Sequence, residues 1–357
     1  MDYQHEITIG KKKISIHQPT YFIADIASNH DGDLNRAKEL IWLCKEAGAD
    51  AVKFQHFHAE KIISDMGFKL LGGQGSHQAN WEESVFDVFK QYELNRSWNE
   101  ELQGEANKAE IEFFTTPYDF SAVEEINQLV NAYKIGSGDI TWIEFIEHVA
   151  KKNKPVLIAT GASDFLDVER AVTTILRYNK EIVLMQCNTN YTGSLENFKY
   201  INLNVLKTFA IMYPNMILGL SDHTPGHATV LGSIALGARV IEKHFTDDNN
   251  RVGPDHPFSM NPKTWLEMVE RSRELENALG NGVKVIEENE LDTVVVQRRG
   301  IYLKENIEAG MTIEEKHIEF LRPAPEGIYL PFEVKQVIGS TMHKSKSIGD
   351  PVLRGDI

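Results

Sequence analysis

The sequence predicts an α/β protein, a (β/α)8 TIM barrel followed by a small, mostly β unit. From Tyr21 to about Phe245, short apolar, β-branched runs alternate with amphipathic stretches of helical period, and these runs number eight. This repetition indicates a parallel sheet, and eight strands favour a closed barrel over an open doubly wound sheet. The length of 357 residues accommodates a barrel of about 250 residues and one smaller domain.

The eight predicted strands are bounded by stretches with turn or helix character. They are Tyr21–Asp25, Ala51–Gln55, Glu112–Thr115, Tyr133–Ile135, Val156–Ala159, Ile182–Gln186, Ile217–Ser221 and Val240–His244. Between the first two, LNRAKELIWLCKEAGAD has apolar positions at helical spacing, and Gly48 lies beyond its end. The segment 61–93 is long for a loop between a strand and a helix, so we expect it to form a flap over an active site.

The strand and helix alternation ends around residues 280–289, where LGNGVKVIEENE is typical of a linker. From Thr293 the chain shows short strands and tight turns, with Gly310-x-x-Ile313-x-x-x-x-Ile318 echoed by a similar spacing from Gly349 to Ile357. We therefore predict two domains, a barrel over residues 1–284 and a small β domain over residues 285–357.

Composition excludes several classes of partner and of location. The formal net charge of −15 disfavours nucleic acid and an anionic membrane surface, because both would be repelled. No signal peptide or apolar run of about 18 residues occurs, and Cys44 and Cys187 fit reduced core thiols better than a disulfide framework. We expect a cytoplasmic protein with no nucleic-acid or membrane partner.

Polar residues end or follow every predicted strand. They are Asp25, Asn29 and His30; Lys53 and Gln55; Thr115 and Thr116; Lys134, Ser137 and Asp139; Thr160; Asn188 and Tyr191; Ser221, Asp222 and His223; and Glu242, Lys243 and His244. Because the active site of such a barrel lies at the C-terminal ends of its strands, we expect these residues to form one site.

Alternation along the strands predicts which side chains meet. Residues two apart face the same side of a strand, so Glu242 and His244 share one side. Closure of the barrel brings His223 and Asp25 towards them. A lone histidine at a strand end is more often a hydrogen-bonded core or surface residue, but two imidazoles beside carboxylates suit a divalent ion such as Mn2+ or Mg2+.

Two lysines predict an anion site across the barrel. Lys53 and Lys134 are on the inner face, and Ser137 in a Gly-Ser-Gly turn offers a hydroxyl and backbone N–H donors to a phosphate. A barrel lysine also suits a Schiff base, which is the rival mechanism. The histidine pair favours the metal-dependent reaction, because a Schiff-base aldolase needs no metal.

These motifs make the chain resemble the N-acetylneuraminate synthase family, which includes synthases of sialic, legionaminic and pseudaminic acids. The segments that carry the resemblance are IADIASNHDGDLNRAKELI, AVKFQ, FFTTPYD, YKIGSGDI, GLSDHT, VIEKHFTDDNNRVGPDHPFSMNP and RRGIYLKENIEAGMTI. The resemblance implies a metal-dependent condensation of phosphoenolpyruvate with an amino-sugar aldehyde. It also implies a C-terminal antifreeze-like (SAF) β-clip domain, which reaches the partner's active site in a domain-swapped homodimer.

The resemblance also implies a role for each matching residue. His223 and His244 match metal ligands, and Asp25, Glu242, Lys53 and Lys134 match catalytic positions. Phosphoenolpyruvate-binding positions are matched by Lys53, Thr116, Lys134, Ser137 and Ser221. Thr160 and Thr189 are expected to bind phosphoenolpyruvate as well, at places where the chain departs from the family pattern. Sugar-binding positions are matched by Gln55, Asn80, Asp139, Tyr191, Asp255 and Arg322, the last donated by the partner subunit.

Departures from the family pattern leave the sugar open. Asp25 and Asp139 replace glutamates, Ala159 replaces a phosphate-binding serine next to Thr160, and Thr189 stands where the family has asparagine. The predicted substrate is an N-acetylmannosamine-like aldehyde. The alternatives are a 2,4-diacetamido-6-deoxy hexose, as in legionaminic or pseudaminic acid synthesis, and a phosphorylated sugar. Outside the synthases, a metal-dependent barrel hydrolase and a non-catalytic carbohydrate- or ice-binding protein are the other classes.

Overall fold

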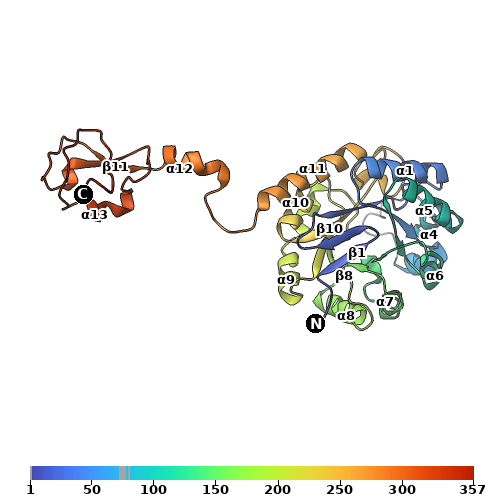
Figure 1. Cartoon of the computed structure of the whole chain (residues 1–357). Coiled ribbons are helices and arrows are strands. Elements are labelled where there is room, and N and C mark those ends of the chain that lie inside the picture. Colours follow the sequence, from blue (N-terminus) through green and yellow to red (C-terminus); the bar gives the residue numbers. More distant parts are fainter. Residues whose placement is uncertain (1, 72–77, 79–80) are drawn as a thin grey trace. The chain divides into compact units, whose positions relative to one another are not determined.

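The computed structural model describes residues 2–71, 78 and 81–357, and Figure 1 shows the path of the chain. Its contacts divide the chain into two compact units, Met1–Gly280 and Asn281–Ile357. The predicted boundary between residues 284 and 285 falls a few residues further on, in a segment whose residues 280–290 are all exposed.

Eight parallel strands form the centre of the first unit. In the hydrogen-bonded order they run β5-β4-β3-β10-β9-β8-β7-β6, and the end strands β5 and β6 pack against each other, so the sheet is a nearly closed barrel. The strands are β3 (Tyr21–Asp25), β4 (Ala51–His56), β5 (Glu112–Pro117), β6 (Tyr133–Ile135), β7 (Val156–Ala159), β8 (Ile182–Cys187), β9 (Ile217–Asp222) and β10 (Ala238–His244).

The predicted fold class is confirmed, and each predicted strand is found with its ends moved by two residues or fewer. The two histidine-bearing strand ends lie side by side, because Glu242 pairs with Ser221 on β9 and His244 pairs with Asp25 on β3. Register therefore brings the ends of β3, β9 and β10 to one rim.

Helices surround the barrel strands (Figure 1). They are α1 (Leu34–Glu46), α2 (Ala59–Ile62), α3 (Asp65–Leu70), α4 (Val85–Gln91), α5 (Asn99–Lys108), α6 (Phe120–Ile126), α7 (Ile143–Ala150), α8 (Phe165–Leu176), α9 (Val205–Met212), α10 (Ala228–Ala235) and α11 (Pro262–Leu279). The predicted helix α1 starts where the Asp33 side chain accepts hydrogen bonds from two backbone N–H groups, and it buries Leu40, Ile41 and Cys44 against the sheet. Among the helices of the described residues, none is both long and apolar enough to cross a membrane.

An N-terminal hairpin, which the sequence did not predict, closes one end of the barrel. Strands β1 (Glu6–Ile9) and β2 (Lys12–Ser15) pair antiparallel. Their buried side chains Ile7, Ile9 and Ile14 form one cluster with inward-facing residues near the N-terminal ends of the barrel strands. This apolar plug leaves the C-terminal ends of the strands as the end at which polar groups gather.

The second unit is small and contains short strands. β11 (Gly300–Leu303) pairs antiparallel with β12 (Ile318–Leu321), and two short helices, α12 (Leu291–Gln297) and α13 (Val334–Val337), accompany them. The faint sequence repeat has a structural counterpart, since Gly310 and Gly349 both have a φ of 88°. Ile313 and Val352, at matching places in the repeat, are both in the core of this unit.

Candidate active site

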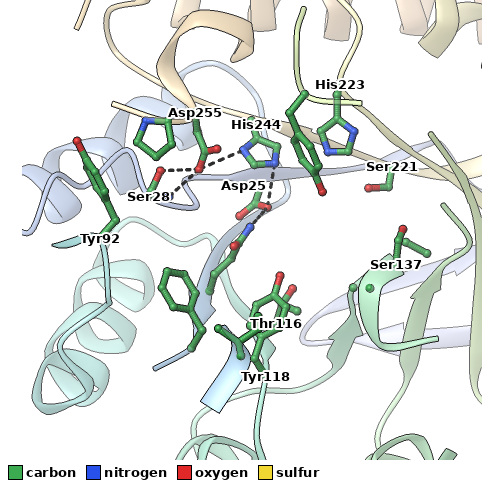
Figure 2. Close-up of a pocket in the computed structure, with 18 of the residues that line it drawn as sticks. Asp25, Ser28, Tyr92, Thr116, Tyr118, Ser137, Ser221, His223, His244 and Asp255 are labelled. Atoms are coloured by element: carbon green, nitrogen blue, oxygen red, sulfur yellow. Dashed lines mark hydrogen bonds and ion pairs between the residues drawn. The ribbon is translucent and has the colours of Figure 1, made fainter. Parts of the chain in front are cut away.

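A cavity of about 300 Å3 opens at the C-terminal ends of the barrel strands (Figure 2). Most of the residues predicted for the site line it. They are Asp25, Lys53, Gln55, Thr116, Lys134, Ser137, Tyr191, Ser221, His223, Glu242, His244 and Asp255. The structure therefore gathers in one place residues that are more than 200 positions apart in the sequence.

Four buried charged side chains form a network along one wall of this cavity. Lys53 Nζ lies 2.7 Å from Asp25 Oδ2 and 3.7 Å from Glu242 Oε2, and Lys134 Nζ lies 3.0 Å from Glu242 Oε1. Two hydroxyls join the network, because Lys53 donates to Thr116 Oγ1 (2.9 Å) and Ser221 donates to Glu242 Oε1 (3.0 Å). The alternation that predicted these inward directions is confirmed.

Contacts within this network keep its side chains charged although they are buried. Burial by itself would neutralise Asp25, but Lys53 and, to a smaller extent, His244 hold the pKa of this carboxyl below its ordinary value. Burial likewise opposes ionisation of Glu242, and Lys134 and Lys53 lower its pKa. Burial disfavours the charged form of Lys53, whereas Asp25 and Glu242 raise its pKa. The site thus holds two ammonium groups whose counter-ions are protein carboxylates.

The two predicted metal ligands face each other beside this network. The ring centroids of His223 and His244 are 5.3 Å apart, and the Tyr191 ring packs 4.2 Å from His223. Asp255 Oδ2 lies 3.9 Å from His244 Nδ1, and Ser28 fixes it by donating from both its hydroxyl and its backbone N–H (Figure 2).

The donor set fits a divalent ion. His223 Nδ1 lies 3.0 Å from the carbonyl oxygen of Asn188, to which it donates its proton in a hydrogen bond. The lone pair of Nε2 is therefore free to bind a metal ion. Burial and the neighbouring His244 lower the pKa of His223 to about 3, so its imidazole is neutral. His244 Nδ1 is buried and has no hydrogen-bond partner among the described residues. No cluster of three or more potential metal ligands occurs in the described ranges, so water and substrate would complete the coordination.

Three predicted site residues in the described part of the barrel do not line the cavity. Thr160 is buried, with its hydroxyl donating to the carbonyl oxygen of Met185, and Thr189 and Asp139 also lie outside the lining. Asn80 lies outside the described residues. Arg322 belongs to the second unit, and its contact with a partner's site stays a prediction.

Two of the rim residues point away from the cavity, which corrects the expectation that every polar strand-end residue joins one site. Lys243 Nζ contacts Asp222 Oδ2 at 2.5 Å, and this carboxylate also accepts hydrogen bonds from Thr224 and Thr229. Lys243 and Asp222 are 1% and 2% exposed. Their neighbours in sequence, His244 and His223, face inward, so alternation sends every second residue to the helix side.

Sequence reasoning missed two parts of the site. Ser28, which holds Asp255, follows the predicted strand by only three residues, but nothing marks its partner 227 positions away. Val88 and Phe89 also line the cavity and come from the segment expected to be a flap. Their helical spacing over Val85–Gln91 was the available signal.

Comparison with known proteins agrees with this geometry. The model of the NeuB family matches residues 40–284. An uncharacterized protein of Methanocaldococcus jannaschii is 39% identical over 89% of each chain, and the N,N'-diacetyllegionaminic acid synthase of Legionella pneumophila is 35% identical over 93% of each. The structure of an N-acetylneuraminic acid (sialic acid) synthetase from Leptospira borgpetersenii superposes with a TM-score of 0.72 at 28% identity, covering 82% of this chain and 96% of that one. The chain is therefore an enzyme that belongs to the NeuB family.

Proposed function

We propose that this enzyme condenses phosphoenolpyruvate with an amino-sugar aldehyde of the N-acetylmannosamine type, giving a nonulosonic acid and inorganic phosphate. The observation that carries the proposal is the single cavity in which two buried lysines, two carboxylates and two facing histidines meet. The relatives named above, a legionaminic acid synthase and a sialic acid synthetase, support the same reaction class.

Lys53 and Lys134 would bind the phosphoenolpyruvate phosphate and carboxylate. Both are at most 3% exposed, so an anion that displaces part of their contact with Asp25 and Glu242 meets two desolvated ammonium groups. Thr116, Ser137 and Ser221 add hydroxyls to the lining of the cavity. Thr160 and Thr189 stay in the proposal only as residues that would reach the phosphate after local movement.

His223 and His244 would hold a divalent metal, Mn2+ or Mg2+. When bound, such an ion supplies a Lewis acid for the aldehyde oxygen of the sugar. The chain's own contribution is to hold the two imidazoles in place, through the Asn188 carbonyl oxygen beside His223 and Asp255 beside His244.

The carboxylates of Asp25 and Glu242 would serve in the proton transfer. C3 of phosphoenolpyruvate attacks the aldehyde carbon, water adds at C2, and phosphate leaves by cleavage of its C–O bond. Glu242 Oε2 is buried without a hydrogen-bond partner in the described ranges, and Asp25 lies across Lys53 from it. Either carboxylate can accept the proton of the attacking water and stabilise positive charge at C2.

Gln55, Tyr191 and Asp255 are proposed to bind the sugar, together with Asn80 and Asp139. We further propose that the second unit is an antifreeze-like (SAF) domain whose Arg322 reaches the partner's site in a domain-swapped homodimer. Its paired glycines at a φ of 88° support a repeated turn of the β-clip kind. Cys44 and Cys187 are buried thiols without a disulfide, which supports the proposed cytoplasmic location.

The test is a phosphate-release assay with phosphoenolpyruvate, Mn2+ and N-acetylmannosamine, its 6-phosphate or a 2,4-diacetamido-6-deoxy hexose. We expect phosphate from at least one sugar and none without sugar. His244→Ala should abolish turnover and weaken Mn2+ binding measured by calorimetry, while the thermal midpoint stays close to wild type. Phosphate release by His244→Ala at the wild-type rate contradicts the proposed metal site.

A further inference from the structure

The loop that follows β10 supplies part of the cavity lining, and we call its residues 246–259 the rim loop. Its ends are joined, because the Thr246 N–H donates to the Met260 carbonyl oxygen at 2.9 Å. Within the rim loop, Pro254 and Asp255 line the cavity. Asp255 reaches the cavity from the middle of a long loop, so its place depends on the contacts that hold this loop.

The loop between β3 and α1 contacts the rim loop through three side chains. Ser28 donates to the Asp255 carboxylate from its hydroxyl (2.5 Å) and from its backbone N–H (3.2 Å), as Figure 2 shows. Asn29 donates to the hydroxyl of Ser259 at 2.9 Å. The third side chain, Asp31, contacts the part of the rim loop that the other two do not hold.

Asp31 binds the rim loop at two residues. Its Oδ1 lies 2.9 Å from Nε2 of His256, and its Oδ2 lies 2.8 Å from Nη2 of Arg251. Asp31 does so from a left-handed backbone conformation, with a φ of 50°, which aspartate adopts more readily than most residues. His256 is fully buried, and its second ring nitrogen lies 2.7 Å from the hydroxyl of Thr246. The ring therefore cannot turn without losing a hydrogen bond.

The sequence around His256 couples its position to that of Asp255. Gly253 leaves room for the ring, because a Cβ at this residue would lie 2.7 Å from His256 Cδ2. Pro254 and Pro257 flank the pair and fix their own φ angles, which restricts the backbone on both sides. A shift of His256 therefore moves its neighbour Asp255 and is not absorbed by the loop.

We infer that Asp31 and His256 position Asp255 to bind the sugar substrate. Asp255 Oδ2 lies 3.9 Å from His244 Nδ1, and the Asp255 side chain is 19% exposed, so this carboxylate can still accept hydrogen bonds from a ligand in the cavity. The inference rests on the proposed function, in which Asp255 binds the sugar. It adds two positioning residues that do not themselves line the cavity.

Asp31→Ala tests the inference, because it removes the contact with His256 and leaves Arg36 paired with Asp247. Phosphate release is measured at saturating Mn2+ with whichever of N-acetylmannosamine, its 6-phosphate and a 2,4-diacetamido-6-deoxy hexose the wild-type enzyme uses fastest. We expect the KM for the sugar to rise by about 10-fold, while kcat and the KM for phosphoenolpyruvate stay within about twofold of wild type. A residue that only stabilises the fold would lower the thermal midpoint without this difference between the two KM values.

Asp255→Ala shows whether Asp31 acts through Asp255. This variant should itself raise the KM for the sugar by at least as much as Asp31→Ala. In the Asp255→Ala background, Asp31→Ala should raise this KM no further, because the group that it positions is gone. Additive increases in the double variant mean that Asp31 acts on another part of the site, and they overturn the inference.

Two variants on the rim loop are matched controls. Asp248→Ala removes an exposed carboxylate that accepts a hydrogen bond from the Asn250 N–H, and the KM for the sugar should stay at the wild-type value. Arg251→Ala removes the exposed partner of Asp31 and keeps the contact with His256. The KM for the sugar should then rise by less than about 3-fold, because an ion pair that is open to solvent contributes little.

The outcomes separate this inference from the proposed function. If Asp31→Ala does not fold, His256→Gln takes its place, because one amide cannot contact both Asp31 and Thr246 as the two ring nitrogens do. Its KM for the sugar should rise by about 3-fold or more. Release of no phosphate by wild type with any of the three sugars overturns the proposed function and this inference with it. A KM for the sugar that is unchanged in the positioning variant, or that rises as much in Asp248→Ala, overturns the inference alone.

Discussion

Two buried lysine and carboxylate networks lie on opposite faces of the barrel sheet, one inside it and one under the helices. On the inner face, Lys53 and Lys134 contact Asp25 and Glu242 at the cavity. On the outer face, Lys243 contacts Asp222 under the helices. Both networks come from strand ends and use the same kinds of residue, so residue type alone does not distinguish them.

The networks differ in how completely their polar atoms are satisfied. The outer network is closed, because Asp222 accepts from Lys243, Thr224 and Thr229, and Lys243 also donates to the Thr224 carbonyl oxygen. In the inner region, Glu242 Oε2 and the nearby His244 Nδ1 are buried with no hydrogen-bond partner in the described part of the chain. A network whose polar atoms are all hydrogen-bonded stabilises the fold. A network that faces a cavity and has polar atoms without a hydrogen-bond partner is suited to bind a ligand.

The largest effect should come from Glu242→Gln, which keeps the shape of the inner network but removes one charge. We expect kcat to fall by about 10³- to 10⁴-fold, because the variant loses a proton acceptor and a counter-ion for Lys134. The urea midpoint should fall less than in a variant that breaks the outer network, because Lys134 faces the cavity and stays beside the amide oxygen of the new side chain. Phosphate release and urea unfolding on the same preparation measure both.

The contrary outcome is that Glu242→Gln unfolds at a much lower urea concentration while each folded molecule keeps its activity. Glu242 would then stabilise the fold, and the two networks would not differ in role. Glu267→Gln is a suitable control, because this residue makes the same chemical change on an exposed position of α11.

Asp222→Asn should give the next largest effect, which is a loss of stability and not of activity. Removing one partner of a buried ion pair leaves Lys243 as an uncompensated charge, so we expect the free energy of unfolding to fall by about 3–5 kcal/mol. The double variant Asp222→Leu/Lys243→Met removes both charges and should recover most of this loss.

Urea unfolding of Asp222→Leu, Lys243→Met and the double variant completes the cycle. Additive losses in the double variant would mean that the pair has no coupling, and the outer network would then not be the closed structural unit described above.

Asp139 sharpens the comparison, because it is a half-buried carboxylate for which no ion pair with a lysine occurs among the described residues. Its Oδ2 has no hydrogen-bond partner among the described residues, and burial raises its pKa from 3.8 to about 6. Between about pH 4 and pH 6, folded Asp139 keeps a proton that the unfolded chain has released. Stability is therefore lost as the pH rises through this window, by about 3 kcal/mol for a shift of this size.

Asp139→Asn should not show this loss, so its stability relative to wild type should increase between pH 4 and pH 7.5. Urea midpoints of both proteins at the two pH values measure the difference, in which the contributions of the other titrating groups cancel. An unchanged difference between the two proteins would mean that Asp139 is ionised in the folded state at pH 5.

The contrast between the two faces also explains what could be predicted from the sequence. The strands and the inward direction of Lys53, Glu242 and His244 follow from period-two alternation, which is local. The position of Val88 and Phe89 at the cavity and the Ser28 contact with Asp255 depend on where loops and short helices return to the barrel, which no local pattern determines. Thr160 was expected at the phosphate site, but its hydroxyl donates a hydrogen bond to the backbone carbonyl oxygen of Met185.

The smallest predicted effects come from two matched hydroxyl deletions, one in each network. Ser221 donates to Glu242 Oε1 at 3.0 Å, and Thr229 donates to Asp222 Oδ2 at 2.8 Å. A hydrogen bond to a charged group contributes about 1.5 kcal/mol, so each deletion removes a similar interaction.

The consequences should nevertheless appear in different measurements. Ser221→Ala should lower kcat/KM by about 10-fold and leave the urea midpoint near wild type, because water in the cavity can replace the hydroxyl at Glu242. Thr229→Val should lower the free energy of unfolding by about 1.5 kcal/mol with kcat/KM unchanged, because no water reaches Asp222 in its place. If both variants lost the same amount of stability, the number of satisfied polar atoms would not distinguish the functional network from the structural one. The missing hydrogen-bond partner of Glu242 Oε2 would then need another explanation.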